Sequence, residues 1–76
     1  MKKAEFLKEL EEIFQREEPC NAEDVLDDYD EWDSLSKMAI LAFFSKNFGI
    51  KITLNSLQDI KTVEDLIKLA GENIDD

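Results

Sequence analysis

The chain has 76 residues, of which 19 are acidic and 9 basic, and its formal net charge is −10. This charge argues against a nucleic-acid-binding surface, which needs cations facing the phosphates, and against adhesion to an anionic membrane. It favours steering toward basic partners. A chain of this length buries only about 60% of its unfolded surface, and we expect one small domain, residues 1–76, that is a monomer.

The chain has no histidine and one cysteine, Cys20. Zinc sites built from His and Cys, and Ser-His or Cys-His nucleophile pairs, are therefore excluded, and we expect no enzymatic activity. A lone cysteine forms no internal disulfide, which suits a cytoplasmic protein. We interpret Cys20 as a loop or core thiol, and a reactive thiol is the alternative. Charged residues interrupt any signal-peptide core near Met1, and no apolar run is long enough to span a membrane.

The first predicted element is a helix over residues 4–16. Its apolar residues recur at three- and four-residue spacing, which gives one stripe facing a core. This stripe consists of Phe6, Leu7, Leu10, Ile13 and Phe14. Pro19 is expected to break this helix.

A long connection, residues 17–33, follows the first helix and holds nine acidic residues and no base. Asn21 is expected to cap a short turn over Ala22–Leu26. Four apolar residues are expected to anchor the connection against the helices: Val25, Leu26, Tyr29 and Trp32. The acids do not form an EF-hand, because counting from Asp28 places Asp33 at the glycine position and Ala39 at the final glutamate position.

The second predicted helix spans Ser34–Phe48, because Asp and Ser are favoured at a helix N-terminus and Gly49 is favoured just after its end. It contains no carboxylate. Its core side is predicted to comprise Ile40, Leu41, Phe44 and Phe48. A second apolar side comprises Leu35, Met38, Ala39 and Ala42. A helix that is apolar nearly all round is either wholly buried or covered by a partner; we favour the partner, and complete burial is the alternative.

The remainder of the chain predicts a loop, a turn and a last helix. Residues 50–54 alternate like a strand but have no strand to pair with, so we expect a loop. Residues 55–60 predict a short helical turn, and Thr62 with Asp65 predicts a helix start. The last helical stripe is formed by Val63, Leu66, Ile67, Ala70 and Ile74. The predicted fold is all-α, a small three- to four-helix bundle with a long first loop.

The motif Asp33-Ser34-Leu35 places a serine hydroxyl at the positive end of the second helix, where a phosphate is favoured. Alone, these three residues indicate no more than a helix cap. In context, an acidic loop leads into Trp32-Asp33-Ser34-Leu35, an apolar helix ends at Phe48-Gly49, and Thr62-Val63-Glu64-Asp65 follows a short turn. This order and spacing resemble the acyl carrier protein family, the phosphopantetheine-binding carrier domains, over essentially the whole chain.

The resemblance implies that Ser34 carries a covalent 4′-phosphopantetheine, whose thiol holds a carboxylic or amino acid as a thioester. No neighbouring group activates Ser34, so a phosphopantetheinyl transferase would attach the arm. Ser36, the nearest rival hydroxyl, lies inside the helix. The other implied partners are an acyl- or aminoacyl-loading ligase and a downstream transferase. The predicted partner-binding residues are Asp33, Leu35, Met38, Ala39 and Ala42.

The sequence also departs from the fatty-acid carriers of this family. In those carriers the partner-facing side of the second helix typically bears acids, whereas here the matching positions are Ala39, Ser45 and Lys46. Phe43 and Phe44 add bulk where a long acyl chain would need room. We therefore expect a freestanding carrier of a small acyl or aminoacyl unit in a specialised pathway. The alternatives are a housekeeping fatty-acid carrier and an unmodified acidic helical adaptor with the same fold.

Overall fold

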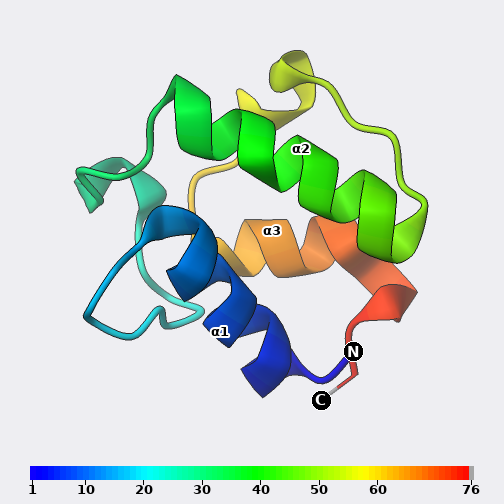
Figure 1. Ribbon diagram of the computed structural model, residues 1–76, viewed down its shortest axis with the longest axis horizontal. Coiled ribbons are helices and arrows are strands. Elements are labelled where there is room, and N and C mark those ends of the chain that lie inside the picture. Colours follow the sequence, from blue (N-terminus) through cyan, green and yellow to red (C-terminus); the bar gives the residue numbers. More distant parts are fainter. Residues whose placement is uncertain (76) are drawn as a thin grey trace.

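The computed structural model describes residues 1–75, and helices are its dominant elements (Figure 1). The α-helices are α1 (Lys3–Phe14), α2 (Ser34–Phe48) and α3 (Val63–Ala70). Short 3₁₀ turns lie in the connections: η1 (Leu26–Asp28), η2 (Leu54–Leu57) and η3 (Gly71–Asn73). No strand forms within residues 1–75, where only two isolated bridges pair extended residues. The predicted all-α bundle with a long first loop is confirmed.

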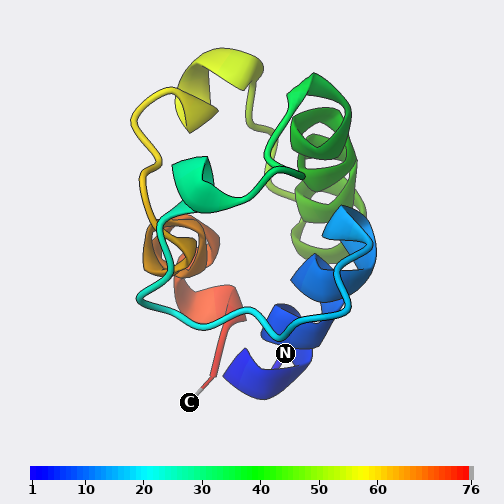
Figure 2. The same cartoon turned by 90° about the vertical axis from the view of Figure 1, so that its left-hand side faces the viewer.

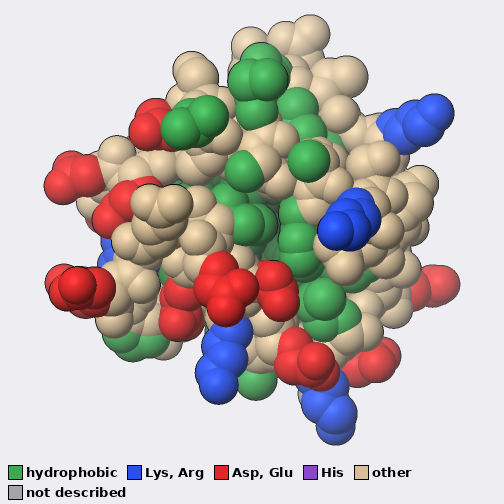
Figure 3. Space-filling view, in the orientation of Figure 1, with side chains coloured by type: hydrophobic (Ala, Val, Ile, Leu, Met, Phe, Trp, Pro, Cys, Tyr) green, Lys and Arg blue, Asp and Glu red, His purple; other side chains and the backbone are tan. Residues whose placement is uncertain are grey.

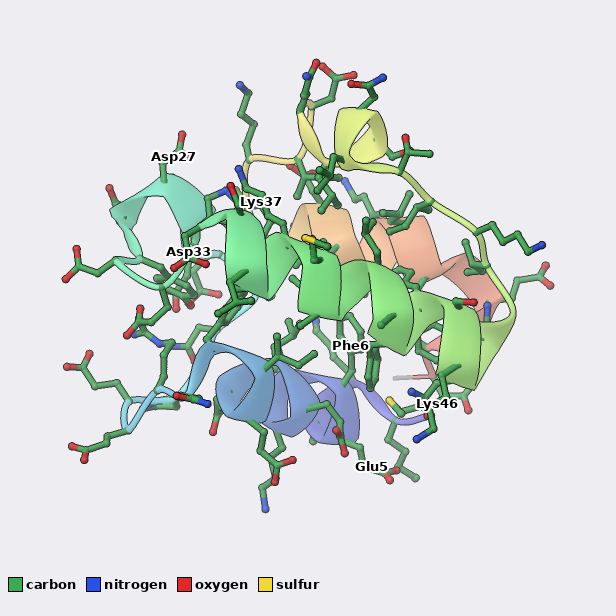
Figure 4. All side chains as sticks on the ribbon, turned by 45° about the horizontal axis from the view of Figure 1, so that its top comes forward. Glu5, Phe6, Asp27, Asp33, Lys37 and Lys46 are labelled. Carbon is green, nitrogen blue, oxygen red and sulfur yellow. The ribbon has the colours of Figure 1, made fainter. Side chains whose placement is uncertain are left out.

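The core lies where the apolar stripes of the three helices meet. In Figure 4 the Phe6 side chain points from α1 toward α2, and Phe6 is fully buried. The other buried core residues of the helices are Leu10, Phe14, Ile40, Phe44, Val63, Leu66 and Ala70. The stripes predicted from three- and four-residue spacing are thus the faces that the helices bury, and they fix α2 across α1 and α3.

The ends of two helices differ from the predicted ones. α1 ends at Phe14, not at residue 16, because Gln15 takes a left-handed conformation (φ 56°) and its N–H donates to the carbonyls of Glu11 and Glu12. Pro19 therefore does not terminate α1. α3 ends at Ala70, where Gly71 has a φ of 61°, and the predicted stripe residue Ile74 lies beyond the helix. The turn predicted over residues 55–60 is the shorter segment Leu54–Leu57.

The long first connection is held against the start of α3. The Leu26 N–H donates to the Lys61 carbonyl at 2.9 Å, and the Val63 N–H donates to the Asp24 carbonyl at 3.0 Å. Figure 2 shows this connection running past the start of α3 before it reaches α2. Of the four predicted anchors, Leu26 and Tyr29 are buried and Trp32 is half-buried. These contacts fix the position from which α2 begins.

Two details of the first connection were predicted wrongly. Val25 is not an anchor, because 42% of its surface is exposed and its backbone instead pairs with Thr62. Asn21 does not cap a turn over Ala22–Leu26. The carboxylate of Asp24 accepts a hydrogen bond from the Asn21 N–H at 3.0 Å, and the 3₁₀ turn begins only at Leu26.

The two ends of the described chain lie side by side (Figures 1 and 2). The Lys3 N–H donates to the Asp75 carbonyl, and the Asp75 N–H donates to the Met1 carbonyl, each at 2.7 Å. These ends are remote from the beginning of α2. Within residues 1–75, no helix is both long enough and apolar enough to cross a membrane.

Candidate functional site

A reciprocal pair of hydrogen bonds fixes the beginning of α2. Asp33 is the N-cap in an extended conformation, and its Oδ1 accepts from the Ser36 N–H at 2.9 Å. In return, the Ser36 Oγ accepts from the Asp33 N–H at 3.1 Å. This capping box satisfies donors that a helix N-terminus otherwise leaves unpaired. The Asp33-Ser34 start of α2, predicted from sequence, is confirmed.

The two serines at this end of α2 have different environments. Ser36 is only 6% exposed, and its hydroxyl donates to the Glu31 carbonyl at 2.6 Å. Ser34, the first residue of α2, is exposed. Among residues 1–75, no partner forms a hydrogen bond with the Ser34 hydroxyl. The accessible hydroxyl is therefore that of Ser34, and the rival at Ser36 is held inside the capping box.

The backbone around Ser34 suits a covalently attached phosphate. The first hydrogen bond within the helix runs from the Lys37 N–H to the Asp33 carbonyl at 3.0 Å. The N–H groups of Ser34 and Leu35 precede it and have no helical acceptor, so they are free for an anion at the positive end of the helix dipole. The residues present thus fit a phosphodiester on Ser34 Oγ.

One cation lies in the first turn of α2. The Lys37 Nζ lies 5.0 Å from the centre of the Trp32 ring, within the range of a cation–π contact. Figure 4 shows Lys37 and Asp33 at the same end of α2, with Asp27 on the neighbouring η1. Lys37 therefore partly offsets the acidic connection near Ser34 and favours a negatively charged group there.

The second apolar side of α2 faces outward, so complete burial of this helix is ruled out. Leu35 is 79% and Met38 59% exposed, and Ala39 and Ala42 are exposed as well. Ile40 and Phe44 are buried on the opposite side, with Leu41 and Phe48 half-buried, as predicted for the core side. Figure 3 shows apolar side chains reaching the surface over α2. Ser45 and Lys46, near the end of this helix, are also exposed.

A shallow open groove adjoins the exposed side of α2. Its apolar wall combines Leu35, Met38 and Ala39 with Ile13 and Phe14 from the end of α1. Asp30, Glu31 and Asp33 also line this groove. The sequence assigned Ile13 and Phe14 to the core stripe alone, and their proximity to Leu35 depends on how α1 packs under α2.

Aromatic rings fill the space between α1 and α2. Phe6 lies 6.0 Å from Phe43 and from Phe44, and 6.2 Å from Phe48, between ring centroids. Phe48 in turn lies 5.6 Å from Phe43 and 5.4 Å from Phe44. Four interlocked rings occupy this volume, which is consistent with the bulk expected from Phe43 and Phe44.

Arg16 is a residue of this region that the sequence reasoning missed. Its guanidinium carbon lies 3.8 Å from the centre of the Tyr29 ring, and its Nη1 donates to the Glu31 Oε1 at 3.1 Å. The one available signal was compositional: Arg16 is the single arginine of the chain and directly precedes the nine acids of residues 17–33.

Cys20 and the acids of the connection form no evident reactive or metal centre. Cys20 is a core residue with 3% exposure, and burial raises the pKa of its thiol. This favours the unreactive thiol form. Within residues 1–75, no group of three or more His, Cys, Asp or Glu side chains is arranged to hold a metal ion.

Comparison with protein families gives one match, to the phosphopantetheine attachment site family, over residues 4–70. No curated protein and no solved structure matches the chain. Domains of this family are not catalytic themselves; they are carriers that interact with a phosphopantetheinyl transferase and with biosynthetic enzymes. The match covers α2 and α3, all of α1 but its first residue, and the exposed serine at the start of α2. The chain therefore belongs to the phosphopantetheine attachment site family, as an acyl-carrier-type domain that bears 4′-phosphopantetheine covalently.

Proposed function

We propose that Ser34 Oγ is the attachment point and that the carrier shuttles a small acyl or aminoacyl unit between enzymes of a specialised pathway. The observation that carries this proposal is the contrast between the exposed, uncommitted Ser34 hydroxyl and the buried Ser36 hydroxyl. When bound, the prosthetic thiol supplies a thioester linkage to the cargo. The partners are then a phosphopantetheinyl transferase, an acyl- or aminoacyl-loading ligase and a downstream transferase.

The chain's own residues would hold and orient the phosphodiester. Asp33 fixes the first turn through its bond to the Ser36 N–H, and the N–H groups of Ser34 and Leu35 offset the phosphate charge. No histidine is available to activate the serine hydroxyl. The Asp33 carboxylate is already engaged as the cap. An external transferase would therefore supply the base for attachment.

Intact-mass spectrometry tests the attachment point. The protein is incubated with coenzyme A and a broad-specificity phosphopantetheinyl transferase. We expect the wild type to gain one phosphopantetheine, Ser34→Ala to gain none, and the matched variant Ser36→Ala to gain one. Attachment that survives in Ser34→Ala would overturn the assignment, and an unmodified wild type would favour the adaptor alternative.

The character of α2 supports a specialised carrier over a housekeeping fatty-acid carrier. Ala39, Ser45 and Lys46 are exposed where a fatty-acid carrier of this family would offer acids to a basic enzyme patch. Like charges brought together across an interface cost affinity. Docking would instead use the apolar side of α2, with Leu35, Met38, Ala39 and Ala42 flanked by Asp33 and Lys37.

The packing between α1 and α2 supports a small cargo. The rings of Phe6, Phe43, Phe44 and Phe48 pack against one another between α1 and α2 and leave little room there for a long sequestered chain. Close-packed interiors accept added groups only at the cost of strain or displacement. We further propose that residues 1–76 form one domain that acts as a monomer in the cytoplasm.

A further inference from the structure

Arg16 occupies an unusual place for the only arginine of a strongly acidic chain. Its side chain is 13% exposed and lies over the Tyr29 ring at 3.8 Å. Its Nε is buried and has no acceptor among residues 1–75. A buried donor without an acceptor costs stability, so general packing is a poor explanation for an arginine here. Its shorter polar contact, to Glu31, points toward the start of α2.

The contact with Glu31 links Arg16 to the capping box. Arg16 Nη1 donates to Glu31 Oε1 at 3.1 Å. The carbonyl of the same Glu31 accepts from the Ser36 hydroxyl at 2.6 Å and from the Asp33 N–H at 2.9 Å. One residue therefore joins the end of α1 to both members of the cap that surrounds Ser34.

We propose that Arg16 is a positioning residue for attachment at Ser34, acting through Glu31. This inference rests on the proposed attachment to Ser34. The ion pair holds Glu31 against Arg16 despite the neighbouring carboxylates of Asp30 and Asp33. Without it, repulsion and hydration favour movement of Glu31 into solvent. Its carbonyl then leaves Ser36, and the first turn of α2 no longer presents Ser34 in a fixed geometry.

A second acid on the same guanidinium provides a matched control. Arg16 Nη2 lies 3.6 Å from Glu18 Oε2, but the Glu18 side chain is 85% exposed. An exposed ion pair of this kind contributes little to the stability of the fold. Glu18 also makes no contact with the cap. Glu18→Gln and Glu31→Gln each remove one negative charge that faces Arg16. Only Glu31 is connected to Ser36.

The test measures phosphopantetheine attachment with coenzyme A and a broad-specificity transferase, at a temperature where circular dichroism shows each variant folded. We expect kcat to fall about tenfold in Arg16→Gln, the equivalent of one charge-assisted hydrogen bond. KM should change little, because the exposed side of α2 that meets the transferase is intact. Arg16→Lys should recover part of the rate, since lysine keeps the charge but not the planar fork. Glu18→Gln should match the wild type.

A double-mutant cycle separates positioning from a general loss of stability. Glu31→Gln should lower kcat as Arg16→Gln does, and the double variant should be no slower than either. Hydrogen exchange at the Ser36 N–H should speed up in both single variants but not in Glu18→Gln. If Arg16→Gln does not fold, the Arg16→Lys and Glu31→Gln variants carry the same comparison.

Three results would overturn the inference: a wild-type kcat in Arg16→Gln, equal losses in Glu18→Gln and Glu31→Gln, or additive losses in the double variant. These failures differ from failure of the attachment proposal. If the attachment proposal is wrong, Ser34→Ala is still modified. If only the inference about Arg16 is wrong, Ser34→Ala remains unmodified and Arg16 proves dispensable.

Discussion

The Ser36 hydroxyl donates to the carbonyl oxygen of Glu31 at 2.6 Å, and this bond joins the acidic connection to the first turn of α2. The same hydroxyl accepts from the Asp33 N–H at 3.1 Å. Ser36 is thus both a member of the helix cap and the contact that fixes the chain entering it. The exposed Ser34 lies between Asp33 and Ser36, the two members of the cap. Their bonds keep the Ser34 backbone in place while its hydroxyl stays accessible.

Ser36→Ala should destabilise the fold without removing the attachment point. The substitution removes the Ser36 hydroxyl bond to the Glu31 carbonyl and one of the two acceptors of the Asp33 N–H. Losses of cap bonds of this kind cost about 1 kcal/mol. We expect a lower midpoint in urea-induced unfolding with an unchanged slope. Ser45→Ala, an exposed serine on the same helix, should unfold as the wild type does. Equal stability of Ser36→Ala and the wild type would show that the reciprocal cap contributes nothing.

The bounds of α2 were predictable because both ends depend on local chemistry. Asp33 and Ser36, three residues apart, satisfy the first turn through their reciprocal hydrogen bonds. Gly49 takes the left-handed conformation (φ 67°) that its position favours. The end of α1 was not predictable in this way. Gln15 adopts a left-handed conformation without being glycine or asparagine, and no sequence signal marks such a residue.

The surroundings of Ser34 were only partly predictable for a different reason. The outward side of α2 follows from helical periodicity, which places Leu35, Met38 and Ala39 together. The Arg16–Glu31 pair joins residues 15 positions apart through an irregular connection. Its geometry depends on how Tyr29 packs beneath Arg16, and a sequence pattern does not encode such contacts.

Salt and divalent cations should raise the thermal midpoint near neutral pH. Nine acids lie within residues 17–33, and ions screen repulsion between exposed charges beyond about 10 Å at 0.1 M salt. We expect a higher midpoint in calorimetry with moderate sodium chloride or millimolar magnesium. The variant Glu17→Gln/Glu18→Gln/Glu23→Gln, which neutralises three exposed acids, should be less sensitive to salt. An insensitive wild type would mean that these acids are too far apart or already compensated.

Acidification should first raise and then lower the thermal midpoint. The Tyr29 hydroxyl donates to Asp24 at 2.6 Å, and this bond, with that of the Asn21 N–H, lowers the pKa of Asp24 below its usual value. Backbone N–H groups of Lys61 and Thr62 likewise lower the pKa of Asp65. A carboxyl group whose pKa is lowered in the folded state stabilises the fold at any pH above its pKa in the unfolded state. This stability is lost as the pH falls through the pKa of the folded state.

The two effects on acidification therefore act in different pH ranges. Relief of repulsion should begin at about pH 5, where carboxylates in general start to take up protons. Loss of the Asp24 and Asp65 contacts should dominate below about pH 4. The midpoint measured by circular dichroism from pH 7 to pH 3 should pass through a maximum. Tyr29→Phe should lose part of the acid-sensitive stability, whereas a monotonic rise down to pH 3 would contradict the role given to these carboxylates.

The exposed side of α2 should make this carrier a poor substrate for fatty-acid synthase enzymes. A ketosynthase with a basic patch would meet Ala39 and Ser45 where it needs acids, and Lys46 where it needs an opposite charge. The loaded carrier is assayed for elongation by a fatty-acid ketosynthase. We expect the triple variant Ala39→Glu/Ser45→Glu/Lys46→Glu to gain kcat/KM by about tenfold or more at low salt, where steering by charge is strongest.

A control variant distinguishes docking on α2 from attraction by total charge. Lys8→Glu/Lys51→Glu changes the net charge by the same amount at exposed positions outside α2. Because association depends on where the charges face the enzyme, this variant should gain far less than the triple variant. Added salt should reduce the gain of the triple variant, since its new contacts lie at a solvated rim. If the wild type is elongated as fast as a fatty-acid carrier, or if both variants gain equally, α2 does not determine partner choice and the specialised role is wrong.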